Sequence, residues 1–397
     1  MDLGRAPKYS KNSTIDIYVY AAVNNIFLKS AIDQLSAGKI ILNGERNSKR
    51  ELKKVSDIQS LDTVLSRIEG KEPNEILKEM QHVNDEIIKK AVKEGEFEKG
   101  FDASLDSHNV YRYTKIKDSM KRKRKCDDIQ KVVGTKPKNG CYYAHQYMTI
   151  KAVNGDFNPT LDTTPVLPFT NRVKPEWGLI HNAERKTKAE IDCLLGDGDL
   201  DNVDTINMCY GENKHFIFRA DRDAKVQKII REKCSGIWYH IEYGYTKGEG
   251  NHKAQYNLVI IDVNLLKMYN VEMPLMDKKE KYLVYATDLA PRRDESDMDF
   301  CISLVKRHKK RWGIETGYRD KIEFRAPTHA LSYSVRLFFF LLSVILYNLW
   351  VEVNHETKDL PERHEMYPDG ISKYLIGFLL MLAVLTSAHH FSKAHMG

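Results

Sequence analysis

Three carboxylates at the ends of expected elements have the residue types that bind divalent cations. Asp106 ends the short run ASLD, Asp197 ends IDCLLGD at an expected strand-to-loop junction, and Glu315 lies in the basic segment KKRWGIETGYRDKIEF (309–324). Side chains at the carboxyl ends of strands converge where open α/β sheets bind ligands. Close carboxylates repel one another unless cations lie between them, so convergence of these three would indicate a Mg²⁺ or Mn²⁺ site.

The two aspartates also have ordinary structural explanations. An aspartate beside a turn, such as Asp106, commonly forms or caps that turn. Asp197 shares its loop with Asp199 and Asp201, and either of these could serve as the ligand instead.

Glu315 has Arg311 and Arg319 one helical turn away on either side, and Trp312 follows Arg311. Surface helices pair opposite charges at this spacing, so an ion-paired helix is one explanation. The other is a metal-binding glutamate whose arginines face phosphate groups, for which the planar guanidinium is suited. Spacing leaves both explanations open, and it does not by itself join Glu315 to the aspartates.

The periodicity of apolar residues predicts the elements that must position these acids. Residues 13–99 indicate three helices, with Ser60 as the N-cap of the middle one and Gly70 at its end. The basic connector RNSKRELKK suits a helix-turn-helix-like DNA-binding module, and a purely structural helical cap fits equally well. From about residue 101 the period changes to two, and strands then alternate with helices as far as Ala220.

The expected strands of this part are DASLDSHNVYRY, CYYAHQYMTIKAV, PTLDTTPVL, IDCLL and HFIFRA, and the helices lie within NAERKTKAE and VDTINMCYG. The runs GIWYHIEYGY, AQYNLVIIDV and KYLVYAT that follow are rich in β-branched and aromatic residues, which predicts antiparallel strands. From residue 291 onward the pattern is helical.

Composition and charge limit the class of protein. The chain has 397 residues, of which 42% are hydrophobic and 29% charged, typical of a folded globular protein with a large core. The net charge of +7 mildly favours an anionic partner, either nucleic acid or an anionic membrane. The six cysteines are scattered without a CxxC pair, which argues against a zinc or disulfide framework. The N-terminus MDLGRAPKYSKNS has no apolar run, so we expect no secretory signal.

Two apolar runs invite comparison with membrane spans. LFFFLLSVILYNLWV (337–351) has 15 residues, including a serine and an asparagine, and YLIGFLLMLAVL (374–385) has 12. A spanning helix needs about 20 residues. Both runs are therefore predicted to be buried core helices, and no membrane partner is expected.

RWGIETGYR resembles the glutamate signature of DDE transposases from cut-and-paste insertion sequences of bacteria and archaea. That signature reads tyrosine, two residues, arginine, three residues, the catalytic glutamate, six residues, lysine, and Arg311 and Glu315 fall on its arginine and glutamate. ASLDSHNVYRY and LLGDGDLDNVDTI resemble the segments holding the family's two catalytic aspartates, which implies Asp106 and Asp197. The resemblance covers roughly residues 102–350.

The chain departs from the family pattern at four positions. His308 occupies the signature tyrosine position, and Ile322 occupies the lysine position, with Lys321 one residue early. His308 could still donate to a phosphate, and Lys321 could reach back to one. After the second aspartate, Asp199 and Leu200 stand where the family often has an aromatic residue and a glycine.

The resemblance implies a mixed α/β (α+β) fold: a ribonuclease-H-like core with an inserted antiparallel β subdomain and an N-terminal helical domain. The boundaries predicted are 1–99 for the helical, DNA-end-binding domain, 100–220 for the first part of the core, 221–290 for the β insertion, 291–352 for the second part of the core with the glutamate helix, and 353–397 for a helical tail.

The resemblance also implies a reaction and its partners. Asp106, Asp197 and Glu315 would hold two Mg²⁺ ions, for which Mn²⁺ can substitute, and cut and join DNA through a hairpin intermediate. The partners would be the terminal inverted repeats of the element and target DNA, bound by a homodimer. The expected location is the cytoplasm, in association with the nucleoid.

Several residues are expected to contact DNA on this interpretation: His308, Arg311, Trp312, Arg319, Lys321 and Trp238. Trp238 belongs to the β insertion, where relatives hold a flipped base on an aromatic ring, although an aromatic residue in a strand commonly belongs to the core. The basic run KRKRK (121–125) suits contacts to a DNA backbone or a solvated loop.

Other enzyme classes find little support. The sequence has no GxSxG and no P-loop motif, which argues against a serine hydrolase or an ATPase. The remaining alternative is a catalytically decayed or non-transposing DNA-binding or nuclease relative on the same core.

Overall fold

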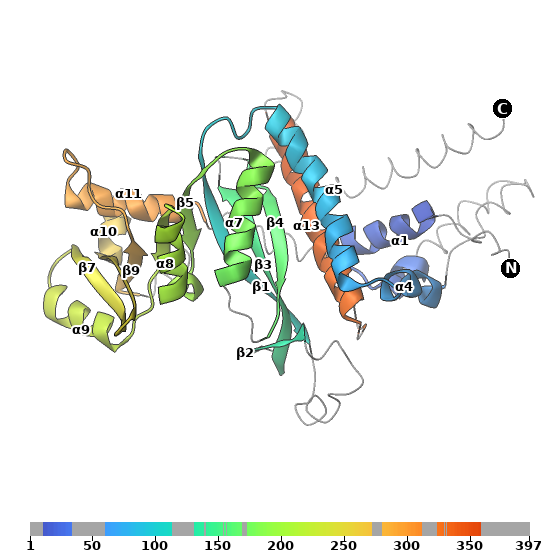
Figure 1. Ribbon diagram of the computed structural model, residues 1–397, viewed down its shortest axis with the longest axis horizontal. Coiled ribbons are helices and arrows are strands. Elements are labelled where there is room, and N and C mark those ends of the chain that lie inside the picture. Colours follow the sequence, from blue (N-terminus) through green and yellow to red (C-terminus); the bar gives the residue numbers. More distant parts are fainter. Residues whose placement is uncertain are drawn as a thin grey trace, which may run out of the picture. The chain divides into compact units, whose positions relative to one another are not determined.

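The computed structural model describes residues 11–33, 60–112, 131–138, 140–153, 155, 157–168, 173–271, 280–311, 324–328, 330 and 332–358. The chain divides into two compact units, 1–87 with 317–397, and 88–316. The described part of the first unit is helical, whereas the second contains the β-sheet (Figure 1).

The helices of the first unit are α1 (Lys11–Val23), α4 (Leu61–Glu69), α5 (Pro73–Lys93), which continues past the end of this unit, and α13 (Tyr333–Glu356). The Ser60 carbonyl accepts the first helical hydrogen bond of α4, from the Val64 amide at 3.0 Å, and Gly70 follows the last residue of the helix. The predicted start and end of the middle helix are therefore confirmed.

The first apolar run forms the interior of α13. This helix has 24 residues, more than the apolar run itself, because the flanking polar residues continue the helix. Among the described residues it is the one helix long and apolar enough to cross a membrane, yet 78% of its most apolar window is buried in the protein. Its Asn348 donates to the Asn84 side chain at 2.7 Å, and its Ser343 donates to the Phe340 carbonyl. The expected core helix is confirmed, whereas the run 374–385 lies outside the described residues.

The described part of the second unit contains nine strands and the helices that connect them. The strands are β1 (Phe101–Arg112), β2 (Val133–Lys138), β3 (Cys141–Val153), β4 (Thr160–Val166), β5 (Ile191–Gly196), β6 (His215–Arg219), β7 (Tyr239–Glu249), β8 (His252–Asp262) and β9 (Tyr282–Thr287). The helices are α7 (Val173–Thr187), the 3-10 turn η2 (Gly198–Leu200), α8 (Val203–Gly211), α9 (Ala224–Lys233), α10 (Val263–Met268) and α11 (Asp297–Lys309).

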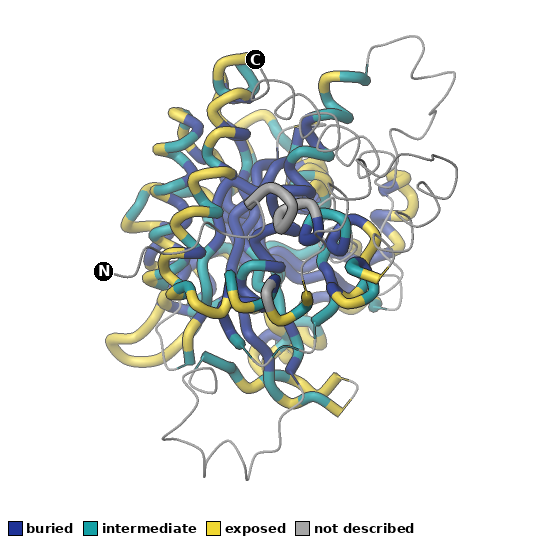
Figure 2. Tube along the Cα trace, turned by 90° about the vertical axis from the view of Figure 1, so that its right-hand side faces the viewer, coloured by how far each residue is buried: buried dark blue, intermediate teal, exposed yellow. Residues whose placement is uncertain are grey.

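All nine strands belong to one sheet, in the order β2-β3-β1-β5-β6-β9-β8-β7, with β4 also paired to β3. The pairs β1–β3 and β3–β4 are antiparallel, whereas β1–β5 and β5–β6 are parallel. β9 then pairs antiparallel with β6, and β8 and β7 continue in the same sense. Figure 2 shows the buried residues gathered in the interior of the tube, and β9 is buried along its whole length.

Side-chain caps define several of the connecting helices. α8 begins after Asn202, whose side chain accepts from the Thr205 amide, and α9 begins after Asp223, which accepts from the Val226 amide. α7 and α8 contact each other, and Figure 1 shows them on one face of the sheet. α11 packs on β6 and β7.

The sequence located most of these elements, with three differences. α7 begins at Val173, well before the predicted helix, and ends before Lys188, which has a φ of 58°. A left-handed residue at that place closes a helix, so residues 188–190 are not helical. β2, α9 and α10 were not predicted. The strands expected in residues 221–290 are antiparallel as predicted, and their ladder continues that of β6 without a break.

Candidate active site

Asp106 lies in the middle of β1, just beyond the last residue paired with β5, and Asp197 directly follows the end of β5. β1 and β5 are paired as far as Ser104 and Leu195, so continuing this register by two residues brings Asp106 beside Asp197. Both side chains are half-buried. This register sets the two expected aspartates on neighbouring parallel strands, at the level where β5 ends and β1 continues.

Local hydrogen bonds orient both carboxylates. Asp197 is the N-cap of η2, and its Oδ1 accepts from the Asp199 amide at 3.1 Å. The Leu200 amide donates to the Asp197 carbonyl at 3.2 Å. The Asp106 Oδ1 accepts from the Ser107 amide at 2.7 Å. Each carboxylate is thus restrained by the backbone that follows it.

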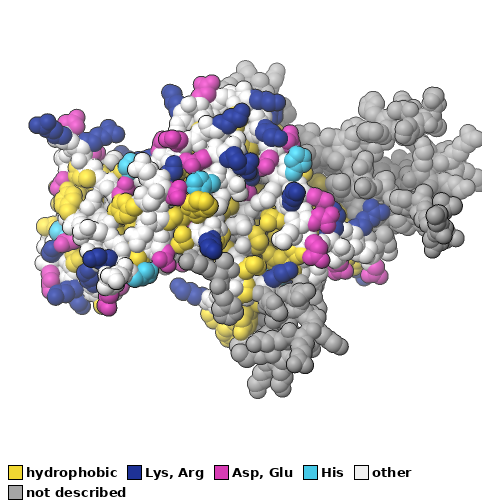
Figure 3. All heavy atoms as spheres, in the orientation of Figure 1, with side chains coloured by type: hydrophobic (Ala, Val, Ile, Leu, Met, Phe, Trp, Pro, Cys, Tyr) yellow, Lys and Arg dark blue, Asp and Glu magenta, His cyan; other side chains and the backbone are white. Residues whose placement is uncertain are grey.

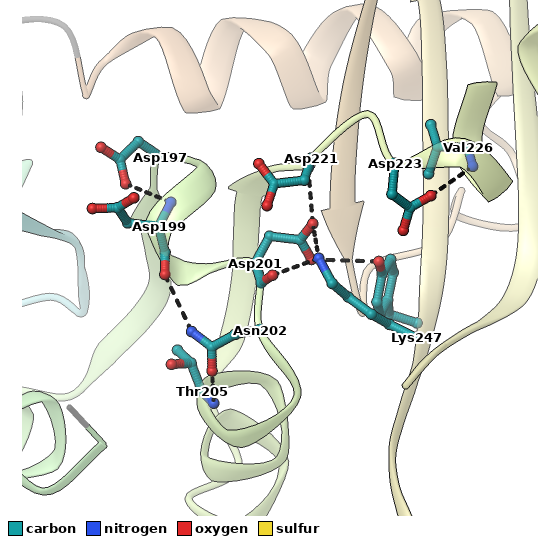
Figure 4. Close-up of polar contacts among 10 residues, drawn as sticks. Asp197, Asp199, Asp201, Asn202, Thr205, Asp221, Asp223, Val226 and Lys247 are labelled. Carbon is teal, nitrogen blue, oxygen red and sulfur yellow. Dashed lines mark hydrogen bonds and ion pairs between the residues drawn. The ribbon is translucent and has the colours of Figure 1, made fainter. Parts of the chain in front are cut away.

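Asp201, one of the alternatives to Asp197, is occupied within the protein (Figure 4). Its side chain is 1% exposed and accepts from Lys247 Nζ at 2.5 Å, from the Asp221 amide at 2.9 Å and from the Tyr256 hydroxyl at 3.4 Å. These contacts make Asp201 a structural carboxylate that joins β7 and β8 to the loop after β5. Asp197 is therefore the stronger metal-ligand candidate of the two.

Asp221 is an acid that the sequence analysis did not single out. It follows β6, the next parallel strand, and its Oδ1 lies 3.0 Å from the position that a Cβ on Gly198 would take. Partial burial raises the pKa of Asp221; Lys247 opposes the rise, and the charges of Asp201 and Asp199 add to it. The run HFIFRAD, an apolar strand followed by an aspartate, repeats the pattern of IDCLLGD and was the available signal.

The donor chemistry of this end of the sheet fits a hard divalent cation. Mg²⁺ binds carboxylate oxygens, and Asp106 and Asp197 supply carboxylates from β1 and from the residue after its neighbour β5. Glu315, the third expected ligand, lies outside the described residues.

His308 lies in the interior, next to the strand end that precedes Asp197. It is 3% exposed, its Nε2 is 2.8 Å from the Gly196 carbonyl oxygen, and its ring meets that of Tyr285 edge-on with centroids 4.9 Å apart. Burial lowers the pKa of His308 to about 3; the charge of Arg311 also lowers it, and the bond to Gly196 opposes the shift. The ring is therefore neutral at physiological pH, with its proton on Nε2 because a carbonyl oxygen can only accept.

The burial of His308 contradicts its expected DNA contact, because the ring has no surface to offer a phosphate. Arg311 is likewise only 5% exposed, against the expectation that it faces DNA. His308 belongs to the buried side of α11, and Arg311 lies in the turn just after that helix; the charged residues around both gave no sign of this burial. Trp238 is 46% exposed just before β7, where a ring can reach a ligand. The remaining expected DNA contacts lie outside the described residues: Trp312, Arg319, Lys321 and the run 121–125.

The charged side chains of the described surface are mixed. On the face shown in Figure 3, lysine and arginine side chains are interspersed with aspartate and glutamate. Affinity for a polyanion on this face would therefore depend on particular cations rather than on a uniform field.

Comparisons with known proteins give a similarity of fold. The sequence matches no protein-family model and no curated protein. Among solved structures, the chain is similar to piggyBac transposase in a synaptic complex with hairpin DNA, with a TM-score of 0.55 and 11% sequence identity. The similarity covers 97% of this chain and 75% of the piggyBac chain. At that identity the comparison establishes a transposase-like fold for the protein, and the chemistry has to be argued from its own residues.

Proposed function

We propose that the protein is a DDE-type DNA transposase, which cuts and joins the ends of a mobile element. The observation that carries this proposal is the register of β1 and β5, which when continued by two residues sets Asp106 of β1 beside Asp197, the first residue after β5. Metal-dependent phosphodiester chemistry needs converging carboxylates at such a place. The fold similarity to a transposase supports the same conclusion.

The strand order supports a ribonuclease-H-like core. Three antiparallel neighbours, β4, β3 and β1, are followed by β5 and β6, which are parallel to β1. α7 and α8 make the two crossovers into the parallel strands. β7, β8 and β9 form the antiparallel insertion between the second aspartate and the proposed glutamate helix.

Asp106 and Asp197 would hold two Mg²⁺ ions between them, and Glu315 would complete the second site. Two such ions activate an oxygen nucleophile and stabilise the leaving oxygen. In the first step a water oxygen bonds to phosphorus while the bond from phosphorus to the 3′ oxygen breaks, which frees a 3′-hydroxyl. That hydroxyl would then bond to a phosphorus of the opposite strand while the flanking DNA leaves with a 3′-hydroxyl, which closes a hairpin on the element's end. Water would open the hairpin and free the 3′-hydroxyl again, and its attack on a phosphorus of target DNA would release a 3′-hydroxyl of the target strand. The description of the piggyBac complex with hairpin DNA supports the hairpin step.

The substrate would be double-stranded DNA carrying the terminal inverted repeats of the element, held by a homodimer. Among the proposed DNA contacts that the structure describes, Trp238 is the one whose ring is exposed enough to stack on an extruded base. Arg319, Lys321 and Trp312 remain proposed DNA contacts from the resemblance to bacterial and archaeal insertion-sequence transposases.

The test is strand cleavage of labelled DNA carrying the repeats that flank the gene, with Mg²⁺, with Mn²⁺ and with EDTA. We expect nicked and hairpin products with either metal, and their loss in Asp106→Asn, Asp197→Asn and Glu315→Gln, with DNA binding retained. Asp204→Asn is a matched control, because this exposed aspartate on α8 is bonded to His252 away from the strand ends.

Cleavage by Asp106→Asn or Asp197→Asn at the wild-type rate would contradict the assignment. Tight binding of the repeats by a wild-type protein that never cleaves them would favour the alternative, a catalytically decayed or non-transposing relative.

A further inference from the structure

We propose that His308 is a positioning residue, which holds the Gly196 carbonyl and so fixes the backbone from which the Asp197 carboxylate projects. The catalytic part of this inference rests on the proposed function, and the structural part stands on the contacts of His308 alone. The residue comes from α11, 112 positions away in the sequence from the strand end that it holds.

The hydrogen bond lies in a place where water cannot replace it. His308 is 3% exposed, and Gly196 is buried. A buried carbonyl that loses its donor carries an uncompensated desolvation cost, so this backbone group would move or take up another partner. Because Gly196 immediately precedes Asp197, such a movement displaces the proposed ligand.

Packing fixes Gly196 from the other sides. A Cβ at this position would lie 2.3 Å from Leu200 Cδ1 and 2.9 Å from Phe218 Cδ1. Leu200 also donates its amide to the Asp197 carbonyl at 3.2 Å. The segment from Gly196 to Leu200 is thus a tight turn around Asp197, and His308 supplies a side-chain hydrogen bond to its first carbonyl.

α11 has a second anchor that does not depend on His308. Arg307 Nη2 and Nε donate to the two carboxylate oxygens of Asp102 at 2.6 Å and 2.9 Å. This bidentate pair joins α11 to the start of β1, and bidentate guanidinium–carboxylate pairs are the stronger ones. Removing the His308 bond should therefore leave the helix in place and alter mainly the strand end.

The test compares His308→Leu, which has no donor, with His308→Gln, whose side-chain amide can donate to the same carbonyl. Val305→Ala is the matched control, because Val305 is a buried residue of α11 without a side-chain hydrogen bond. Amide hydrogen exchange of residues 197–201 reports on the backbone directly. We expect faster exchange there in His308→Leu, with His308→Gln and Val305→Ala close to wild type.

The second readout is Mn²⁺ binding followed by electron paramagnetic resonance, together with the metal concentration for half-maximal cleavage. Groups that orient metal ligands typically affect metal affinity by about 10-fold or more when removed. We expect a loss of that size in His308→Leu, recovery in His308→Gln, and DNA affinity within about twofold of wild type.

Unchanged exchange at residues 197–201 in His308→Leu would overturn the inference, whatever its activity. Equal losses of metal binding in His308→Leu and Val305→Ala would also overturn it, because they would reflect general destabilisation. Wild-type protein that neither binds Mn²⁺ nor cleaves DNA contradicts the proposed function instead, and with it the catalytic part of the role of His308. The exchange measurement still decides the structural part in that case.

Discussion

Lys247 on β7 places its ammonium nitrogen 2.5 Å from the carboxylate of Asp201, whose side chain is 1% exposed. The same nitrogen is 2.5 Å from the Asp201 carbonyl oxygen. Asp201 follows Asp197 by four positions, so this ion pair joins the inserted strands to the loop of the proposed metal ligand. The pair is largely shielded from solvent, where an unpaired carboxylate is costly.

Lys247→Met should destabilise the protein by about 3 kcal/mol, because it leaves the buried Asp201 charge without its cation. Adding Asp201→Asn should recover part of the loss, since the neutral amide removes the unpaired charge. Chemical denaturation of the wild type, both single variants and the double variant measures the coupling. Lys228→Met is the control: its partner Glu232 is 3.9 Å away on the exposed side of α9, and we expect a change within about 0.5 kcal/mol. Equal effects of Lys247→Met and Lys228→Met would contradict the role given to this pair.

His308 should make stability fall as the pH is lowered. The pKa of His308 is about 3 in the folded protein, against 6.5 for the ordinary side chain. The unfolded chain therefore binds a proton between these values while the folded protein does not, so the contribution is fully present above pH 6.5 and is lost as the pH falls towards 3. Unfolding free energies measured across this range should be flatter in His308→Gln than in the wild type. Parallel curves for the two proteins would show that His308 is not buried as a neutral ring.

Gly196→Ala should destabilise the protein by about 1–3 kcal/mol, because the new methyl group has no room beside Leu200 and Phe218. It should also lower cleavage, since the strand end bearing Asp197 must move. Gly178→Ala is the matched control: its site inside α7 has nothing within 4 Å, and alanine favours the helix, so stability should rise by about 0.5–1 kcal/mol. Thermal unfolding of both variants measures these two opposite changes in stability. A Gly196→Ala protein as stable as the wild type would contradict the packing described.

Trp238→Ala should reduce hairpin formation and leave the first nick close to wild type, if the ring holds an extruded base. Stacking of a base on an aromatic ring is worth about 1–3 kcal/mol, so the expected loss is roughly 5-fold to 150-fold. Trp177→Ala is the control with the same 46% exposure, and the Trp177 ring is bonded to Glu212 on the α7–α8 side. Quantifying nicked and hairpin products on one gel separates the steps, and equal losses in both variants would remove the stacking role.

The strands and helices with strong periodicity were predictable, because local pattern determines them. β1, β3, β5 and α8 lie where alternation or helical spacing indicated. The pairing of β9 with β6 joins residues about 70 positions apart, and no local signal in either strand specifies it. The order in which the strands pair could therefore be learned only from the structure.

The candidate site was predictable to a similar extent. Asp106 and Asp197 were identified by resemblance and by their positions after apolar runs, and their proximity follows from the register of β1 and β5. The burial of His308 and Arg311 was not predictable, because the segment KRHKKR looks like a solvated surface and gives no indication of which side faces the sheet. Asp221 follows an apolar run, as Asp197 does, but the sequence alone does not show that β6 lies next to β5.

The unbroken ladder from β6 through β9 to β7 has a mechanical consequence. An insertion attached only by its two connecting segments could swing as a hinged lid. Here such a swing would require breaking the backbone hydrogen bonds between β6 and β9. The insertion and the parallel strands therefore move together as one rigid sheet. The β7–β8 pairing is irregular farther out, between Glu242 and Tyr245, where Gly244 has a φ of 65°. Beyond that point Lys247 on Asp201 and Asn207 on the Lys253 carbonyl hold the hairpin to the loop after β5 and to α8, so the insertion is fastened at both of its ends.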